Sequence, residues 1–166
     1  MAQFATITSN SSSTRQLFER LTGLLARSPL SAHQLLFRLA IASVFLPAGR
    51  LKLASWESTI AMFQDEYKVP VLAPVVAAVL ATTFEIVCSS LLIAGLATRL
   101  ATLPLLAQIV TIQLFVYPQA WHEHLVWGSI LLFLLTRGAG TISLDYVIQR
   151  RLSTRAGQTD PHFYVR

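Results

Sequence analysis

The stretch ATTFEIVCSSLLIAGLATR, from Ala81 to Arg99, is apolar enough to cross a lipid bilayer, yet it contains the ionisable Glu85. A carboxylate that stays charged and unpaired inside a bilayer costs several kcal/mol. We therefore expect a membrane-spanning helix whose Glu85 faces other helices. The carboxylate should have either a positively charged partner or a bound proton.

The composition of the whole chain predicts an integral membrane protein. Of the 166 residues 54% are hydrophobic and 13% charged, with a mean hydropathy of +0.56, whereas soluble domains carry about 25% charged residues. A soluble helical bundle would lack the polar surface to hide so much apolar sequence. Four segments approach the ~20 residues that cross a hydrocarbon core: Ser31–Gly49, Val69–Ala97, Leu100–Tyr117 and Ala120–Thr136. The expected fold is all-α, a polytopic membrane four-helix bundle.

The basic residues predict how these segments are oriented. Lysine and arginine are frequent before the first segment and after the fourth, whereas the loop after Tyr117 has none. Lysine and arginine accumulate in the cytoplasmic loops of membrane proteins, so we expect both termini to be cytoplasmic. The membrane expected is the plasma (bacterial inner) membrane. The net charge of +5 then suits anionic lipid headgroups, and no nucleic-acid partner is expected.

Three parts of the chain are expected. Residues 1–30 should form a polar tail and an amphipathic interfacial helix, since Leu17, Leu21 and Leu24 recur at helical spacing. Residues 31–146 should form the transmembrane domain, and residues 147–166 a basic cytoplasmic tail.

The polar residues inside the segments suggest two alternatives for Glu85. Helical spacing places Thr82, Glu85 and Ser89 on one small, polar stripe that packs against other helices. On the first segment Arg38 lies about two turns from the cytoplasmic end, within reach of Glu85 by a long side chain. Glu85 is either paired with Arg38 or protonated and available for proton exchange.

The sequence WHEHLVW, Trp121 to Trp127, is the cluster most like a ligand set. His122 and His124 suit copper, zinc or iron, but two histidines spaced in this way project to different sides of a helix. The competing interpretation places Trp121 and Trp127 as interfacial anchors and the histidines in a loop at headgroup level, where a quinone head also fits. The single Cys88 excludes an internal disulfide or a CxxC relay.

Short motifs occur in order along these segments. An arginine lies early in the first segment, Gly-x-x-Lys at its exit, a glutamate in the second, Gly-x-x-x-Arg at its end, and Gly-x-Gly with Ser-Leu-Asp after the fourth. These residues are Arg38, Gly49, Lys52, Glu85, Gly95, Arg99, Gly138, Gly140, Ser143 and Asp145. In this order, over residues 34 to 146, the chain resembles the DoxX family of small four-helix membrane proteins.

The resemblance implies a membrane accessory role near redox chemistry. Some DoxX relatives are subunits of a membrane thiosulfate:quinone oxidoreductase, and others accompany redox, stress-response or peptide-modifying enzymes. We therefore expect an accessory or anchoring subunit of a redox system, with a protein partner or as a homo-oligomer and with quinone as the candidate cofactor. If it takes part in an enzyme, it would be a non-catalytic or quinone-binding subunit of a membrane oxidoreductase, since no flavin, haem or iron–sulfur ligand set is visible.

The candidate residues follow from this expectation. Glu85 and Arg38 would handle protons, while Trp121, His122 and Lys52 would contact a quinone. Two alternatives remain: a small transporter or exporter lined by Glu85 and Arg38, and a metal-handling partner using His122 and His124. Six motif residues are interpreted as structural: Gly49, Gly95, Arg99, Gly138, Gly140 and Asp145.

Overall fold

The fold comes from a computed structural model, which describes residues 15–16, 29–70 and 72–155. The chain divides into two compact units, Met1–Leu30 and Ser31–Arg166. The interfacial helix predicted in residues 1–30 lies outside the described residues except for the helical Arg15 and Gln16, and so does the end of the basic tail after Arg155.

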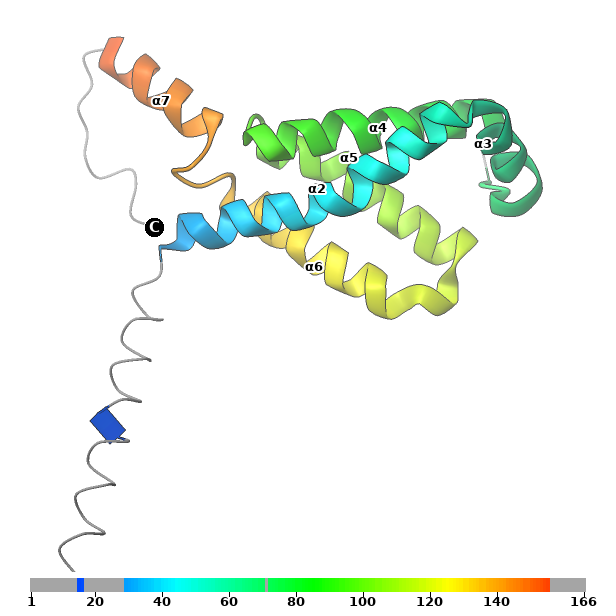
Figure 1. Cartoon of the computed structure of the whole chain (residues 1–166), viewed down its shortest axis with the longest axis horizontal. Coiled ribbons are helices and arrows are strands. Elements are labelled where there is room, and N and C mark those ends of the chain that lie inside the picture. The colour runs from blue at the N-terminus through cyan, green and yellow to red at the C-terminus, as the bar shows by residue number, and fades with distance from the viewer. Residues whose placement is uncertain (1–14, 17–28, 71, 156–166) are drawn as a thin grey trace, which may run out of the picture. The chain divides into compact units, whose positions relative to one another are not determined.

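The described part of the second unit is helical, without strands (Figure 1). Four long helices, joined by short ones, form the bundle. The long helices are α2 (Leu30–Ala54), α4 (Pro74–Ala94), α5 (Thr98–Thr111), which continues as a π-helix, η2 (Ile112–Val116), and α6 (Trp121–Arg137). The short elements are α3 (Trp56–Met62), the π-helix η1 (Phe63–Tyr67), the 3-10 helix η3 (Pro118–Ala120) and the terminal α7 (Leu144–Arg155).

Length and hydropathy confirm a membrane protein. Three helices of the described chain are long and apolar enough to cross a bilayer: Leu30–Ala54, Pro74–Ala94 and Thr98–Val116. The fourth, α6, has 17 residues, about 25 Å at 1.5 Å per residue, which is slightly short of the ~30 Å hydrocarbon core.

The ends of two helices differ from those expected, for local reasons. α2 continues past Gly49 to Ala54, despite Pro47 in its interior, so Lys52 lies on a helix and not in a loop. α4 begins at Pro74, which needs no N–H partner at the first helical position. It ends at Ala94, because Gly95 adopts a left-handed conformation with φ of 67°.

The core is built by all four long helices. Apolar side chains from each of them meet in one buried cluster: Ile41, Phe45, Cys88, Leu92, Ala101, Leu105, Ile109, Leu131 and Leu134. Cys88 is free and buried within this cluster. A smaller cluster of Phe63, Ala77 and Ala78 attaches η1 to the beginning of α4.

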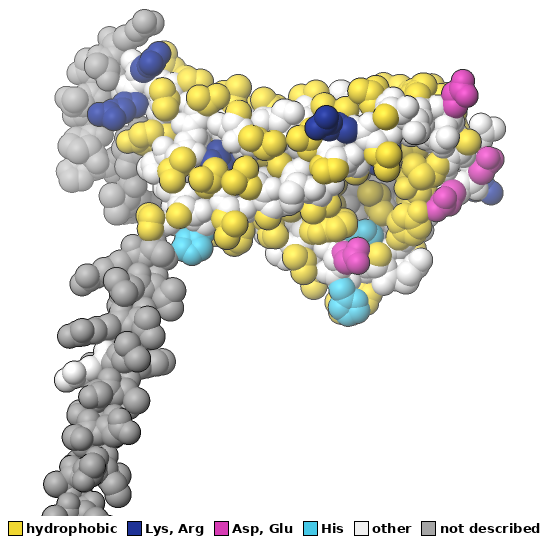
Figure 2. Space-filling view, in the orientation of Figure 1, with side chains coloured by type: hydrophobic (Ala, Val, Ile, Leu, Met, Phe, Trp, Pro, Cys, Tyr) yellow, Lys and Arg dark blue, Asp and Glu magenta, His cyan; other side chains and the backbone are white. Residues whose placement is uncertain are grey.

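Charged side chains are sparse on the surface of the bundle. In Figure 2 hydrophobic side chains are spread over the visible helical surface, and acidic side chains lie toward the end that carries α3 and beside the histidines. Glu57 on α3 and Asp65 and Glu66 on η1 supply three of the acidic groups of the chain. An apolar band between polar ends is the distribution that a bilayer requires.

Candidate functional site

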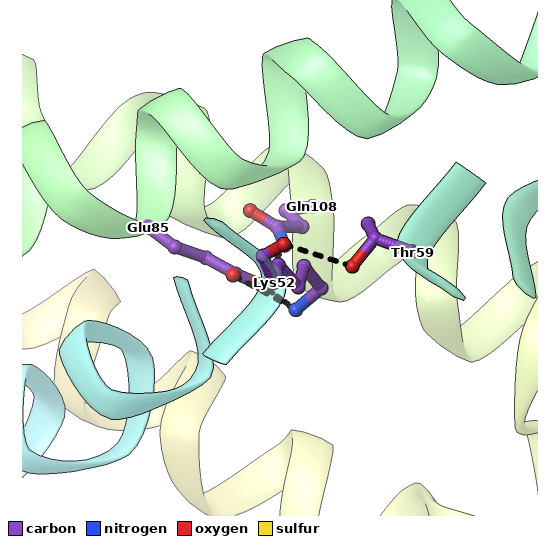
Figure 3. Close-up of polar contacts among 4 residues, drawn as sticks. All are labelled: Lys52, Thr59, Glu85 and Gln108. Carbon is purple, nitrogen blue, oxygen red and sulfur yellow. Dashed lines mark hydrogen bonds and ion pairs between the residues drawn. The ribbon is translucent and has the colours of Figure 1, made fainter. Parts of the chain in front are cut away.

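Glu85, in the middle of α4, has two polar partners from other helices. The Lys52 Nζ donates to both carboxylate oxygens, at 2.7 and 2.8 Å, and the Gln108 Nε2 donates to Oε1 at 2.6 Å. The side chain of Glu85 is 4% exposed and that of Lys52 14%. We call these three residues, from α2, α4 and α5, the buried polar cluster (Figure 3). Its ion pair shows how a carboxylate is held inside an apolar helix.

A glycine brings α2 close enough to α4 for this pair to form. A Cβ at Gly49 would lie 2.8 Å from the Glu85 Cβ and 2.8 Å from the Ile86 Cγ1, too close for any other residue without a shift. Residues three apart share a helix face, so Lys52 emerges beside Glu85. The Thr59 hydroxyl donates to the Lys52 carbonyl at 3.0 Å and satisfies the backbone where α2 ends (Figure 3).

The predicted ion pair between Arg38 and Glu85 is wrong. Arg38 precedes Gly49 by eleven residues, about 16 Å along the helix axis, and Gly49 is the point of α2 that touches Glu85. Lys52 takes the carboxylate because α2 extends beyond its expected end.

Arg38 instead lies at the end of the bundle where α6 and α7 meet. It is 1% exposed, and its Nη2 donates to the Ile142 carbonyl at 2.5 Å. A Cβ at Gly95 would lie 1.7 Å from its Nη1, and Asp145 is the carboxylate whose charge acts on it. The glycine therefore makes room for the guanidinium.

Asp145 also caps α5 from a distance. Its carboxylate accepts the backbone N–H of Ala97 at 2.8 Å and of Thr98 at 3.2 Å. Its own N–H donates to the Gly95 carbonyl at 3.0 Å. The first amides of α5 lack partners within the helix, and an anion is favoured there, so Asp145 ties the start of α7 to the turn between α4 and α5.

The remaining motif residues lie at the same end of the bundle. The Arg99 Nη2 donates to the Thr136 carbonyl at 3.2 Å, and Gly138 ends α6 with φ of 77°. Gly140 gives room to Gln34, since a Cβ there would lie 2.3 Å from its Oε1. The Gln34 Nε2 donates to the Gly138 carbonyl at 3.2 Å. These contacts join the beginning of α2 to the end of α6.

A cavity of about 250 Å³ adjoins the buried polar cluster. Its walls are mostly apolar and come from α4, α5, η1 and η2, including Phe63, Leu80, Phe84, Ala107 and Ile112. Lys52, Glu85 and Gln108 also line it, and Tyr67 and Thr111 are its other polar side chains. An apolar cavity with a few convergent polar groups is typical of a small-molecule site.

Two tyrosines connect η1 to the end of α5 beside this cavity. Tyr67, which lines the cavity, makes edge contacts with Phe63 and with Tyr117, the latter at 5.7 Å between ring centroids. The Tyr117 hydroxyl donates to the Glu66 Oε1 at 2.5 Å. This hydrogen bond is the main reason why the pKa of Tyr117 lies well above its usual value, while burial raises the pKa of Tyr67.

The histidine cluster does not converge on one point. His124 is buried and its Nδ1 meets the Gln113 Oε1 at 2.6 Å, whereas His122 is exposed and stacks on Trp121 at 3.7 Å. Both lie on the first turns of α6 and not in the predicted loop. In the part of the chain that is described, no three His, Cys, Asp or Glu side chains group as for a metal. Trp121 and His122 are also absent from the lining of the cavity, which Lys52 does reach.

The sequence did not predict that Gln108 belongs to this site. Its place on an apolar helix indicates only an interhelical hydrogen bond, and nothing local marks Glu85 as its partner. Tyr117 and Glu66 were also missed, because a contact between residues 51 apart leaves no periodic signal in the sequence.

The fold and the site define a small helical membrane protein, and the comparisons with known proteins agree with that class. Residues 33–118, just over half of the chain, match the family model of DoxX. The chain therefore belongs to the DoxX family. No curated protein and no solved structure matches it.

Proposed function

We propose that this DoxX-family protein is a membrane subunit of a redox system that binds a lipid-soluble small molecule, such as a quinone, in the cavity beside the buried polar cluster. The observation that carries the proposal is the position of Lys52, Glu85 and Gln108 on a mostly apolar cavity wall. We also propose that the protein lies in the plasma (bacterial inner) membrane with both termini cytoplasmic. It would act there with a protein partner or with a second copy of itself.

The residues present suit a quinone. The apolar walls accommodate a ring and the start of a tail, and the polar cluster offers both donors and acceptors to a head. When bound, a quinone supplies a carrier of two electrons and two protons. Lys52 and Gln108 would orient the head, and the Lys52–Glu85 pair would keep charge balanced beside it. The electrons would come from a partner protein.

Arg38 is not part of this proposed binding site. Arg38 is held by the Ile142 carbonyl and lies beside Gly95 and Asp145, away from the residues that line the cavity. Of Glu85 and Arg38, only Glu85 lines the cavity.

The test is to find what the protein retains from its own membrane. We expect a lipid-soluble small molecule and a redox enzyme to co-purify with the tagged chain in mild detergent, as seen by mass spectrometry of the organic extract and of the proteins. Ala107→Phe adds a bulky side chain at the cavity wall, so we expect it to release the small molecule. Val110→Phe is the matched control, because Val110 is exposed on α5 and does not line the cavity.

Two results would overturn the proposal. One is an extract in which wild type carries no molecule beyond the bulk lipids. The other is a molecule retained equally by Ala107→Phe and Val110→Phe, which would place it outside the cavity.

A further inference from the structure

The cavity beside the buried polar cluster opens sideways, between α4 and α5. Two of its lining residues, Leu80 on α4 and Ala107 on α5, are also exposed on the surface. Alanine has a single side-chain carbon, so the rim of the cavity passes beside Ala107. Both residues are apolar and belong to helices that are long and apolar enough to cross a bilayer. The opening between them therefore faces hydrocarbon and not water.

The end of the cavity that lies toward α3 is covered by η1. Phe63 of η1 is buried and packs on the beginning of α4. Tyr67 packs edge-on against Phe63, with 4.9 Å between the ring centroids. The hydrogen bond from the Tyr117 hydroxyl to Glu66 attaches η1 to the end of α5. In the described part of the chain, η1 thus separates this end of the cavity from water.

The ion pair of the cavity lies at the middle depth of the bilayer. Glu85 follows Pro74, the first residue of α4, by eleven residues and precedes Ala94, the last, by nine, which is about 16 Å and about 14 Å along the helix axis. Since the hydrocarbon core is ~30 Å thick, the headgroup of a phospholipid stays about 15 Å away from Glu85. A ligand whose polar group reaches Lys52 and Glu85 must leave the headgroup region.

The charges around the cavity disfavour a charged ligand. Lys52 and Glu85 neutralise each other at 2.7 Å. The other lining residue that can ionise is Tyr67, which is neutral at pH 7 because the tyrosine pKa is about 10. A charged group would enter this mostly apolar cavity without a free counter-charge, at a cost of several kcal/mol.

We propose that the cavity is loaded from the interior of the bilayer, through the opening between α4 and α5, and that it takes uncharged molecules with a hydrocarbon tail and not phospholipids. This rests on the proposed function of the cavity as a small-molecule site. The polar group of the molecule lies beside the Lys52–Glu85 pair. The cavity of about 250 Å³ is smaller than the ~300 to 1,000 Å³ of sites that enclose drug-sized ligands, so the tail extends through the opening among the lipid chains.

The first test measures how fast a bound molecule exchanges. Full-length protein in lipid nanodiscs is loaded with tritiated cetyl alcohol, an uncharged probe with one long chain, and its replacement by unlabelled probe is followed by scintillation proximity. Leu80→Trp narrows the rim of the opening, so we expect exchange about tenfold slower than in wild type. Val79→Trp is the matched control and should exchange at the wild-type rate, because Val79 is exposed on the same helix but does not line the cavity.

A second variant tests the other route, under η1. Tyr117→Phe removes the hydrogen bond to Glu66 and loosens η1 from the end of α5, yet it should leave the exchange rate unchanged. Wild-type exchange in Leu80→Trp, or faster exchange in Tyr117→Phe, would overturn entry from the bilayer. If Leu80→Trp does not fold or does not hold the probe, the rate in Tyr117→Phe decides by itself. Wild-type protein that binds no cetyl alcohol would overturn the proposed function together with its entry route.

The last test concerns charge. Cetyl phosphate has the chain of cetyl alcohol but a charged head. At equal mole fraction in the nanodisc we expect it to displace the bound alcohol about tenfold less well or worse, because its head would have to move to the middle of the bilayer. Equal displacement by the two compounds would overturn the requirement for an uncharged molecule while leaving the entry route in place.

Discussion

Lys52 and Glu85 are each costly in a bilayer when alone and tolerable together. Desolvation penalises either charge by several kcal/mol, and the attraction between them offsets this only while both are present and hydrogen-bonded. The Gln108 amide adds a third hydrogen bond to the same carboxylate. Removal of one charged partner should therefore destabilise the fold more than removal of both.

The first prediction is a double-mutant cycle on this pair. Glu85→Leu leaves the Lys52 ammonium buried without a counter-charge, and Lys52→Met does the same to the Glu85 carboxylate, so each single change should destabilise the fold by about 3 kcal/mol. Lys52→Met combined with Glu85→Leu removes both charges and should recover much of that loss. Unfolding is measured by heating with a thiol-reactive fluorophore, because Cys88 is the single cysteine and is buried. Losses that simply add would show that the two charges are not coupled.

The second prediction concerns the close approach of α2 and α4. Gly49→Ala would place a Cβ 2.8 Å from the Cβ of Glu85, so the helices must separate. We expect a loss of about 1 to 3 kcal/mol, the range for overpacking a core, in the same thermal assay. The control is Gly128→Ala, where a Cβ meets nothing within 4 Å and alanine favours the helix. Equal midpoints for the two variants would contradict the close approach.

At the scale of elements, the sequence predicts the helices better than the contacts between them. Hydropathy places the four apolar segments, because crossing a bilayer constrains length and composition together. The prediction from hydropathy is wrong at the end of α2, because it places Lys52 in a loop although the helix continues to Ala54. That one extra turn determines which cation reaches Glu85. Partner choice depends on where two helices touch, here at Gly49, and a single sequence does not encode this locally.

The third prediction concerns the contact between η1 and the end of α5. The Glu66 hydrogen bond raises the pKa of Tyr117, so its contribution to stability is complete below the ordinary tyrosine pKa of about 10 and is lost as the pH rises through the folded-state pKa. In a tyrosinate absorbance titration, Tyr117 should ionise well above that ordinary value. Glu66→Gln removes the carboxylate and should shift this step downward. A curve that Glu66→Gln leaves unchanged would show that the hydrogen bond is absent in solution.

At the scale of the whole second unit, the two groups of polar residues have different roles. The buried polar cluster lies beside the cavity. The other group lies where the start of α2 meets the loop after α6. There the Thr141 N–H donates to the Ser31 hydroxyl at 3.1 Å, and the Gln34 Nε2 donates to the Gly138 carbonyl. These contacts require the beginning of α2 and the end of α6 to lie at the same end of the bundle. We therefore expect the beginning of α2 and the end of α6 to face the same side of the membrane.

The fourth prediction tests this topology with engineered cysteines in a Cys88→Ala background. Glu57→Cys on α3, Glu123→Cys at the start of α6 and Gln149→Cys on α7 are all at exposed positions. The first two should react with a membrane-impermeant maleimide in intact cells, and the third only after permeabilisation, if the termini are cytoplasmic as the positive residues predict. Because α6 is about 25 Å long, it can cross only with slight thinning of the bilayer or with Trp121 and Arg137 anchored at its two interfaces. Labelling of all three positions from the same side would mean that α6 does not cross.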